Sequence, residues 1–305
     1  MIFKHIFYFL IFIFTLNAIQ ANELKVVCST SDLAWLAKKI GKEQVSVTAL
    51  SDGNDDAHYM DATPKSVKIV SDADLLCFIG LELEIGWLPK IIQKSGNLKV
   101  KPDQIGSCDC SAYIEKLEKV SGPVDRSMGD LHPYGNPHYQ LDPHQFLKAG
   151  KSILESLIKI RPDQKEVFTK NFEALSVELE ALSTKLKDKM KAVGVIKVTQ
   201  YHKEFTYLIS FLEFTSFESI EKTPGVSPSA ERLYSFGVEC KKNEVKLCLA
   251  TMHSPHNKLT KFNSISGVPF IQERITLINF YDDLAYQKFM EEIVDKIIKS
   301  QMITK

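Results

Sequence analysis

The chain has 305 residues, with 38 lysines and arginines against 38 aspartates and glutamates, and 44% of its residues are hydrophobic. This ordinary globular composition excludes wholesale disorder, collagen-like repeats and a polytopic membrane protein. A formal charge of zero provides no bulk attraction for nucleic acid or anionic lipid, so no nucleic-acid partner is expected. The length suits two domains, each with a well-buried core.

Residues 1–21 are predicted to be a secretory signal peptide. Lys4 supplies a basic start, residues 6–16 are almost entirely apolar, and the small residues Ala18 and Ala21 follow. An apolar stretch of roughly 7–15 residues fits a signal peptide, whereas a membrane span needs about 20. We therefore expect a periplasmic protein that is cleaved near Ala21, with a short membrane anchor as the alternative.

Strands and helices are expected to alternate in the first half of the mature chain. Buried strands are predicted at residues 24–29, 45–50 and 74–80. An amphipathic helix through Trp35 and Ile40 follows the first strand, and Thr63-Pro64 has the capping signature of another helix start. This alternation is typical of a parallel sheet with helices on both faces.

A long helix is predicted in the middle of the chain, because residues 163–192 contain no glycine or proline. At 1.5 Å per residue it would span roughly 45 Å, about the length of a domain. Strands resume after it, at residues 195–199, 245–250 and 275–280, and a terminal helix is expected at 286–298. We therefore favour a rigid connection between two lobes over a coiled coil. The predicted fold is α/β, with an N-terminal lobe at 22–160, a connecting helix at 161–192 and a C-terminal lobe at 193–305.

Six cysteines in an exported chain permit disulfides. Cys240 and Cys248 flank a short polar connection and are the expected pair. Cys108 and Cys110 are too close in sequence to bridge comfortably to each other, so they are free or paired elsewhere. A Cys-x-Cys pair can also bind metal, but no second such pair lies nearby, which favours a structural role.

Three histidines stand in loops that follow or connect the predicted strands. His58 lies in the loop after the second strand, His138 in the loop 129–143, and His202 just after the strand 195–199. Ligands of open α/β sheets bind beyond the C-terminal ends of the strands. Imidazole suits zinc, copper and nickel, whereas calcium and magnesium prefer oxygen. The pattern therefore predicts a transition-metal site in the cleft between the lobes.

The local sequences around these histidines resemble the motifs of a known family. The segments are DAHYMDATP (56–64), GNPHYQLDP (135–143), TQYHKEFTYL (199–208) and PGVSPS (224–229). They resemble, in order, motifs of the periplasmic solute-binding proteins (cluster A-I) of zinc and manganese ABC importers. Ala57 stands where this family usually has proline, which should loosen the loop but leave the imidazole available.

The resemblance implies that His58, His138 and His202 are metal ligands. A histidine at the third position points to Zn²⁺ as the transported ligand, since manganese-type relatives usually have a carboxylate there and Mn²⁺ is less favoured. Three neutral imidazoles also suit zinc better than manganese. The resemblance further implies a monomer that delivers its metal to the permease of an ABC importer at the inner membrane.

The fourth ligand is expected to be Asp282. The family commonly supplies an aspartate in an Asp-x-Leu-Gly setting, and Asp282-Asp283-Leu284 matches it except that Ala285 replaces the glycine. Asp283 and a water are alternatives, and an acidic pair that caps the last helix is a structural alternative.

The remaining histidines are given lesser roles. His132 lies in the segment 130–134, a modest substitute for a metal-recruiting loop rich in histidine and aspartate, and a surface position is favoured. His253 and His256 could form a weak second site.

Two other functions are considered. Three histidines and a water also form a catalytic zinc site, but Glu204 is the nearest candidate base and no His-Glu-x-x-His motif is present. The protein is therefore predicted not to be an enzyme. A metal-dependent surface adhesin is the other alternative, and the lack of a lipid-anchor cysteine argues against surface display.

Overall fold

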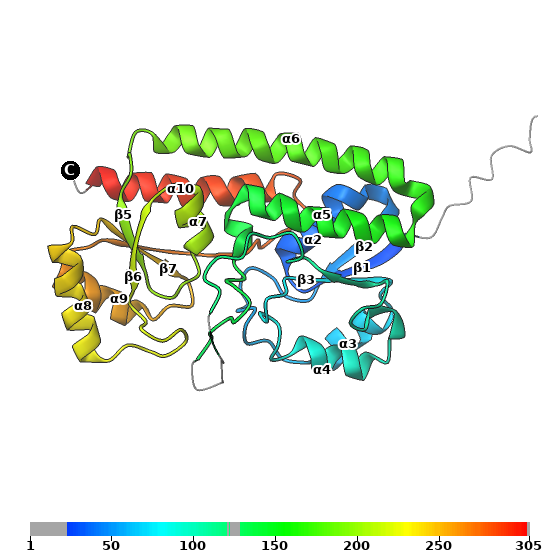
Figure 1. Cartoon of the computed structure of the whole chain (residues 1–305), viewed down its shortest axis with the longest axis horizontal. Helices are drawn as coiled ribbons and strands as arrows, with labels where there is room; N and C mark the ends of the chain where they lie inside the picture. The colour runs from blue at the N-terminus through cyan, green and yellow to red at the C-terminus, as the bar shows by residue number, and fades with distance from the viewer. Residues whose placement is uncertain (1–22, 121, 123–128, 304–305) are drawn as a thin grey trace, which may run out of the picture.

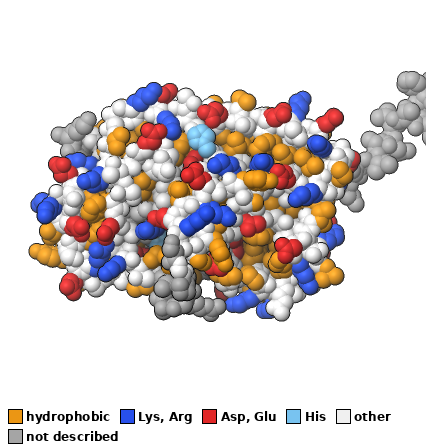
Figure 2. Space-filling view, in the orientation of Figure 1, with side chains coloured by type: hydrophobic (Ala, Val, Ile, Leu, Met, Phe, Trp, Pro, Cys, Tyr) orange, Lys and Arg blue, Asp and Glu red, His pale blue; other side chains and the backbone are white. Residues whose placement is uncertain are grey.

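The computed structural model describes residues 23–120, 122 and 129–303, so the predicted signal peptide and its cleavage site lie outside the described residues. Two four-stranded parallel sheets form the centres of two lobes, which confirms the predicted fold class (Figure 1). Within the described part of the chain, no helix is long and apolar enough to cross a membrane. Figure 2 shows acidic and basic side chains interspersed over one face, as the balanced composition predicts.

The first lobe is built on a sheet of strand order β2-β1-β3-β4. Its strands are β1 (Leu24–Cys28), β2 (Val45–Ala49), β3 (Leu75–Phe78) and β4 (Ser107–Asp109). Helices α2 (Ser31–Gly41) and α5 (Pro143–Ile160) pack together on one face, and α3 (Pro64–Ser71) and α4 (Leu88–Ser95) on the other (Figure 1). Thr63 caps α3 as predicted, since its Oγ1 accepts a hydrogen bond from the Ser66 N–H.

The second lobe repeats this plan with the strand order β6-β5-β7-β8. Its strands are β5 (Lys197–Gln200), β6 (Thr215–Ser219), β7 (Leu247–Thr251) and β8 (Phe270–Glu273). Its helices are α7 (Thr206–Phe211), α8 (Ala230–Lys242) and α9 (His256–Ser266). Short 3-10 helices occur at Lys42–Gln44, Leu98–Val100, Tyr139–Leu141 and Pro162–Gln164.

The prediction of a strand at residues 275–280 is wrong. The last strand is β8, which ends at Glu273, and residues 274–284 are irregular and return to the first lobe. There the backbone groups of Leu277 are satisfied by α2, because its N–H donates to Asp32 Oδ1 (3.1 Å) and its carbonyl accepts from Ser31 Oγ. The apolar alternation of this segment thus reflects packing against a helix rather than a place in the sheet.

The predicted connecting helix is α6 (Lys165–Met190), which runs along both lobes (Figure 1). One row of its apolar side chains is buried in the main core, which rules out an isolated coiled coil. The C-terminal helix α10 (Ala285–Ile303) lies beside α6, and the ion pairs Lys185–Glu291 and Lys189–Asp295 join them. Three chain segments therefore link the lobes: α6, residues 274–284, and α10, which begins against the first lobe and runs to the second.

The expected disulfide between Cys240 and Cys248 is not present in the structure. Both are free thiols, Cys240 in the last turns of α8 and Cys248 in β7. They are fully buried in one apolar cluster of the second lobe, where cysteine serves as a small hydrophobic side chain.

Candidate metal centre

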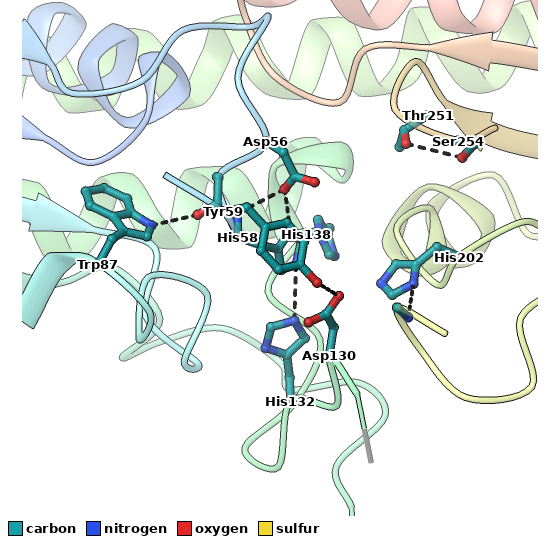
Figure 3. Close-up of polar contacts among 12 residues, drawn as sticks. Asp56, His58, Tyr59, Trp87, Asp130, His132, His138, His202, Thr251 and Ser254 are labelled. Carbon is teal, nitrogen blue, oxygen red and sulfur yellow. Dashed lines mark hydrogen bonds and ion pairs between the residues drawn. The ribbon is translucent and has the colours of Figure 1, made fainter. Parts of the chain in front are cut away.

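Four histidines meet where loops of the two lobes face each other. His58 lies in the loop that follows β2, His132 and His138 lie between β4 and α5, and His202 follows β5. Figure 3 shows the first three on one side and His202 facing them from the other. The structure thus brings together the three predicted ligands and adds His132.

One pair of the four rings has the nitrogen separation of a metal site, whereas no three of these histidines, all within the described part of the chain, place their ring nitrogens within 4.8 Å of one another. The ring centroids of His58 and His138 are 5.2 Å apart, and those of His58 and His132 are 5.3 Å apart. The Nε2 atoms of His58 and His132 lie 3.3 Å apart. In a tetrahedral zinc site with Zn–N bonds of about 2.0–2.1 Å, two ligand nitrogens would be about 3.3–3.4 Å apart. The ring centroid of His202, on the other lobe, lies 6.2 Å from that of His58.

Each of the four rings has an oxygen partner at Nδ1. His58 Nδ1 contacts Asp56 Oδ1 at 2.8 Å, and His138 Nδ1 contacts Asn136 Oδ1 at 3.0 Å. His202 Nδ1 contacts Glu221 Oε2 at 2.9 Å, and His132 Nδ1 contacts the Leu81 carbonyl at 3.2 Å. An oxygen acceptor at Nδ1 places the proton there and leaves Nε2 with its lone pair available for a metal. When neutral, each ring is therefore held in the tautomer that a metal site needs. At His202 the Gly225 N–H also lies 3.3 Å from Nδ1. Burial of this ring is outweighed by the hydrogen bond to Glu221 and by the nearby carboxylates, which raise the pKa of His202, so a metal competes with a proton there.

Burial keeps two of these rings neutral. His138 is only 2% exposed, and its Nε2 has no hydrogen-bond partner among the described residues. Burial, together with the nearby His58, His132 and His202, lowers the pKa of His138 well below its usual value. Burial also lowers the pKa of His132, to about 3. Metals bind the neutral imidazole, so both rings are ready to bind at neutral pH.

Acidic side chains give the cleft a preference for cations. The cleft has a volume of about 140 Å³, and its lining includes Asp56, Asp130, Glu204 and Glu221 beside His58 and His202. Burial raises the pKa of Glu204 to about 7, and its Oε2 has no hydrogen-bond partner among the described residues. This oxygen can accept a proton or approach a bound cation.

The loop that carries His132 also reaches the second lobe. The Asp130 N–H donates to the Pro224 carbonyl (2.9 Å), and the Tyr59 hydroxyl donates to the Asp130 carboxylate. The Gly225 N–H donates to Glu221 Oε2 (2.9 Å), the same oxygen that holds His202. The loop that carries His132 is thereby connected across the cleft to the segment that contacts Glu221, the partner of His202.

The structure does not bring Asp282, the expected fourth ligand, to this cluster. Its carboxylate accepts from the Leu284 N–H and pairs with Lys288 Nζ (2.6 Å) at the start of α10, and its carbonyl accepts from Trp35 Nε1. Asp283 pairs with Lys38. The expectation depended on a final strand that ends just before Asp282, whereas β8 ends at Glu273 and the chain then returns to α2. The structure favours the alternative in which this acidic pair lies at the start of the last helix.

His132 is the site residue that sequence reasoning assigned to the surface. One available signal was its position six residues before His138, in a segment where Pro133 and Gly135 allow the chain to fold back. His256 contacts Gln272, and His144 contacts Asp142 and Glu180 at the start of α5, so neither belongs to this cluster. His253 borders the cleft.

The chain is similar in sequence to lipoproteins named for metal binding and metal transport. The zinc-binding lipoprotein AdcA of Streptococcus pneumoniae serotype 4 is 27% identical over 235 residues, which cover 75% of this chain and 45% of AdcA. The iron ABC transporter substrate-binding lipoprotein MtsA of Streptococcus pyogenes serotype M1 is 26% identical over 180 residues, which cover 57% of this chain and 54% of MtsA. The chain thus spans about half the length of the curated relatives it matches.

A solved structure supports the fold. A deletion mutant of ZnuA with zinc bound superposes with a TM-score of 0.75 at 20% identity, covering 92% of this chain and 98% of that chain. The model of the protein family described as "Zinc-uptake complex component A periplasmic" matches residues 26–300. Its members are binding components for uptake rather than enzymes, in agreement with the prediction against a zinc hydrolase. Because the match extends over residues 26–300 of 305, this chain belongs to the family of periplasmic zinc-uptake complex components A.

Proposed function

We propose that this protein binds Zn²⁺ with high affinity in the cleft between its lobes and delivers it to the permease of an ABC importer at the inner membrane. The ligands are His58, His132, His138 and His202, with His132 in the place first assigned to Asp282. The observation that carries this proposal is the set of oxygen partners at all four Nδ1 atoms, which leaves four Nε2 atoms for one metal ion.

The donor set favours zinc over manganese and iron. Four neutral nitrogens suit zinc and other late transition metals, whereas manganese prefers carboxylates and water. The name of AdcA agrees with zinc, while MtsA is named for iron. Sequence identities of 27% and 26% do not distinguish zinc from iron. The choice of metal therefore rests on the donor atoms, which are all imidazole nitrogens.

Binding would draw on both lobes. Three imidazoles come from the first lobe, and the Nε2 atoms of two of them, His58 and His132, lie 3.3 Å apart. His202 comes from the second lobe and completes the set. Because α6, α10 and residues 274–284 all link the lobes, the motion that accompanies binding and release is expected to be a small tilt rather than a wide closure.

A calorimetric titration tests the proposal. The mature chain from Asn22 onward is stripped of metal and titrated with zinc and with manganese, beside the variants His202→Ala and His256→Ala. We expect one zinc per monomer, much weaker manganese binding, a large loss of affinity in His202→Ala and none in His256→Ala. Zinc affinity that is indifferent to His202, or manganese affinity equal to that for zinc, would overturn the proposal.

A further inference from the structure

A second group of metal-binding atoms lies within the first lobe, apart from the four histidines. Cys77 in β3, Cys108 in β4 and Cys110 just after β4 are all free thiols. Their three sulfur atoms all lie within 4.8 Å of one another, and those of Cys108 and Cys110 are 3.8 Å apart. The sequence alone shows only the Cys-x-Cys pair, and the third thiol comes from a neighbouring strand.

Strand pairing explains why these thiols meet. Cys77 and Cys108 are direct partners in the parallel pairing of β3 with β4, so their side chains project from the same face of the sheet. Cys110 follows Cys108 by two residues and returns to that face. Cys28 of β1 is the partner of Cys77 on its other side and extends the row.

The distances match those within a thiolate metal site. With metal–sulfur bonds of about 2.3 Å, sulfur atoms would be about 3.8 Å apart in a tetrahedral site and about 4.0 Å apart in a trigonal one. The Cys108–Cys110 separation already has this value, and the other two separations need to shorten by less than about 1 Å. We propose that Cys77, Cys108 and Cys110 form a second metal site, which binds a soft cation of the Cu(I) class.

The chemistry of the donors sets the class of ion. Thiolates select soft ions such as Cu(I), whereas the imidazoles of the cleft suit zinc. Each thiol that binds forms a sulfur–metal bond and gives its proton to water, and nothing is oxidised or reduced. The surroundings are apolar, since all three cysteines belong to the main hydrophobic core. A bound Cu(I) would compensate one unit of the thiolate charge there.

The position of β4 provides a route of entry. The three cysteines are at most 3% exposed, so an ion can reach them only by local opening. However, β4 is a three-residue strand at the edge of its sheet. Its opposite face, with Ser107 and Asp109, borders a cavity of about 540 Å³, which gives the strand room to move. Short edge elements with few packed neighbours open at lower free energy than central strands.

The test uses the reduced mature chain without oxygen, after the reductant is removed. Cu(I) is titrated in competition with bathocuproine disulfonate, a coloured Cu(I) chelator, in a His58→Ala/His138→Ala background that disables the imidazole site. Cys108→Ser and Cys110→Ser probe the cluster. Cys248→Ser is the matched control, because Cys248 is an equally buried free thiol in the other lobe.

We expect one tightly held Cu(I) in the background protein. The two cluster variants should weaken binding by more than the roughly 10–100-fold loss that removal of a supporting partner causes, because a ligand itself is removed. Cys248→Ser should not change it. X-ray absorption at the copper edge of the wild-type chain needs no variant, and it should show sulfur ligands.

Three results would overturn the proposal. The first is no Cu(I) retained against the chelator, and the second is equal loss in Cys248→Ser. The third is a thiol titration of the unreduced, denatured protein that finds two fewer thiols than the six cysteines of the sequence, with the missing pair among these three. That result would identify the cluster as a disulfide site.

Discussion

The Nε2 atoms of His58 and His132 lie 3.3 Å apart although 74 residues separate them in the chain. Both rings are held at Nδ1, His58 by the Asp56 carboxylate and His132 by the Leu81 carbonyl. Half of the candidate zinc site is therefore arranged within the first lobe. The second lobe adds His202 to a site that is already partly formed.

Replacing His132 by alanine tests which residue is the fourth ligand. His132→Ala should lower zinc affinity by more than the roughly 10–100-fold that loss of a supporting partner causes, because a ligand itself is removed. Asp282→Ala is the matched comparison and should leave affinity unchanged, since its carboxylate pairs with Lys288. Zinc competition with a chromophoric chelator measures both variants. The reverse order of effects would restore Asp282 as the ligand.

Removal of Glu221 tests the support of His202. Glu221→Ala leaves His202 Nδ1 without its carboxylate partner and leaves the Gly225 N–H with His202 Nδ1 (3.3 Å) as its acceptor, so we expect zinc affinity to fall roughly 10–100-fold. Glu218→Ala is the control, because Glu218 is exposed and its carboxylate pairs with Arg232. Calorimetric zinc titration measures the difference. Equal affinities in the two variants would show that Glu221 does not orient the ring.

Alanine variants of two glycines with similar positive φ values distinguish the effect of backbone strain from the effect of a steric clash. Gly225 and Gly267 have φ values of +74° and +72°, so alanine costs about 1–2 kcal/mol of backbone strain at either position. A Cβ at Gly225 would also collide with the carboxylate of Asp130, whereas a Cβ at Gly267 has nothing within 4 Å. Gly225→Ala should therefore weaken zinc binding, and Gly267→Ala should only lower the melting temperature. Wild-type zinc affinity in Gly225→Ala would show that contact between these two loops does not support the site.

The contribution of Asp32 to the stability of the metal-free protein should fall as the pH rises towards neutrality. Burial raises the pKa of Asp32 from 3.8 to about 7, although hydrogen bonding from the Leu277 N–H acts in the opposite direction. Between these values the folded state holds a proton that the unfolded state has released. The free energy of unfolding therefore decreases with rising pH, by up to about 1.4 kcal/mol per pH unit for this group.

Asp32→Asn should make this pH dependence shallower, because the amide does not titrate. Chemical denaturation between pH 4 and 8, with a chelator present, measures the slope. Other groups also contribute to the slope, since burial raises the pKa of Glu84 and Glu204 to about 7 and lowers that of His132 and His138. Asp283→Asn, with a side chain that is 78% exposed, is the control and should keep the wild-type slope. Equal slopes in all three proteins would contradict the assignment to Asp32.

Much of the fold could be predicted from the sequence, because it depends on local patterns. The run without glycine or proline at 163–192 became α6, and the strands at 24–29 and 45–50 became β1 and β2. Thr63 and Pro64 marked the start of α3. These features depend on propensity and capping, which act over a few residues. The segment 275–280 has the apolar pattern of a strand, but a distant helix satisfies its backbone groups, and no local signal distinguishes the two cases.

The sequence by itself determined the lobed α/β fold and the loops that carry His58, His138 and His202. Strand ends and family-like motifs can be recognised from short runs of adjacent residues. Only the tertiary structure decided that His132 joins them and that Asp282 pairs with Lys288 beside α2. It also brought Cys77 to the Cys108–Cys110 pair. The physical reason is the same in each case. Such contacts depend on strand order, register and the return of the chain between lobes, and these are set by packing over long sequence separations rather than by local pattern.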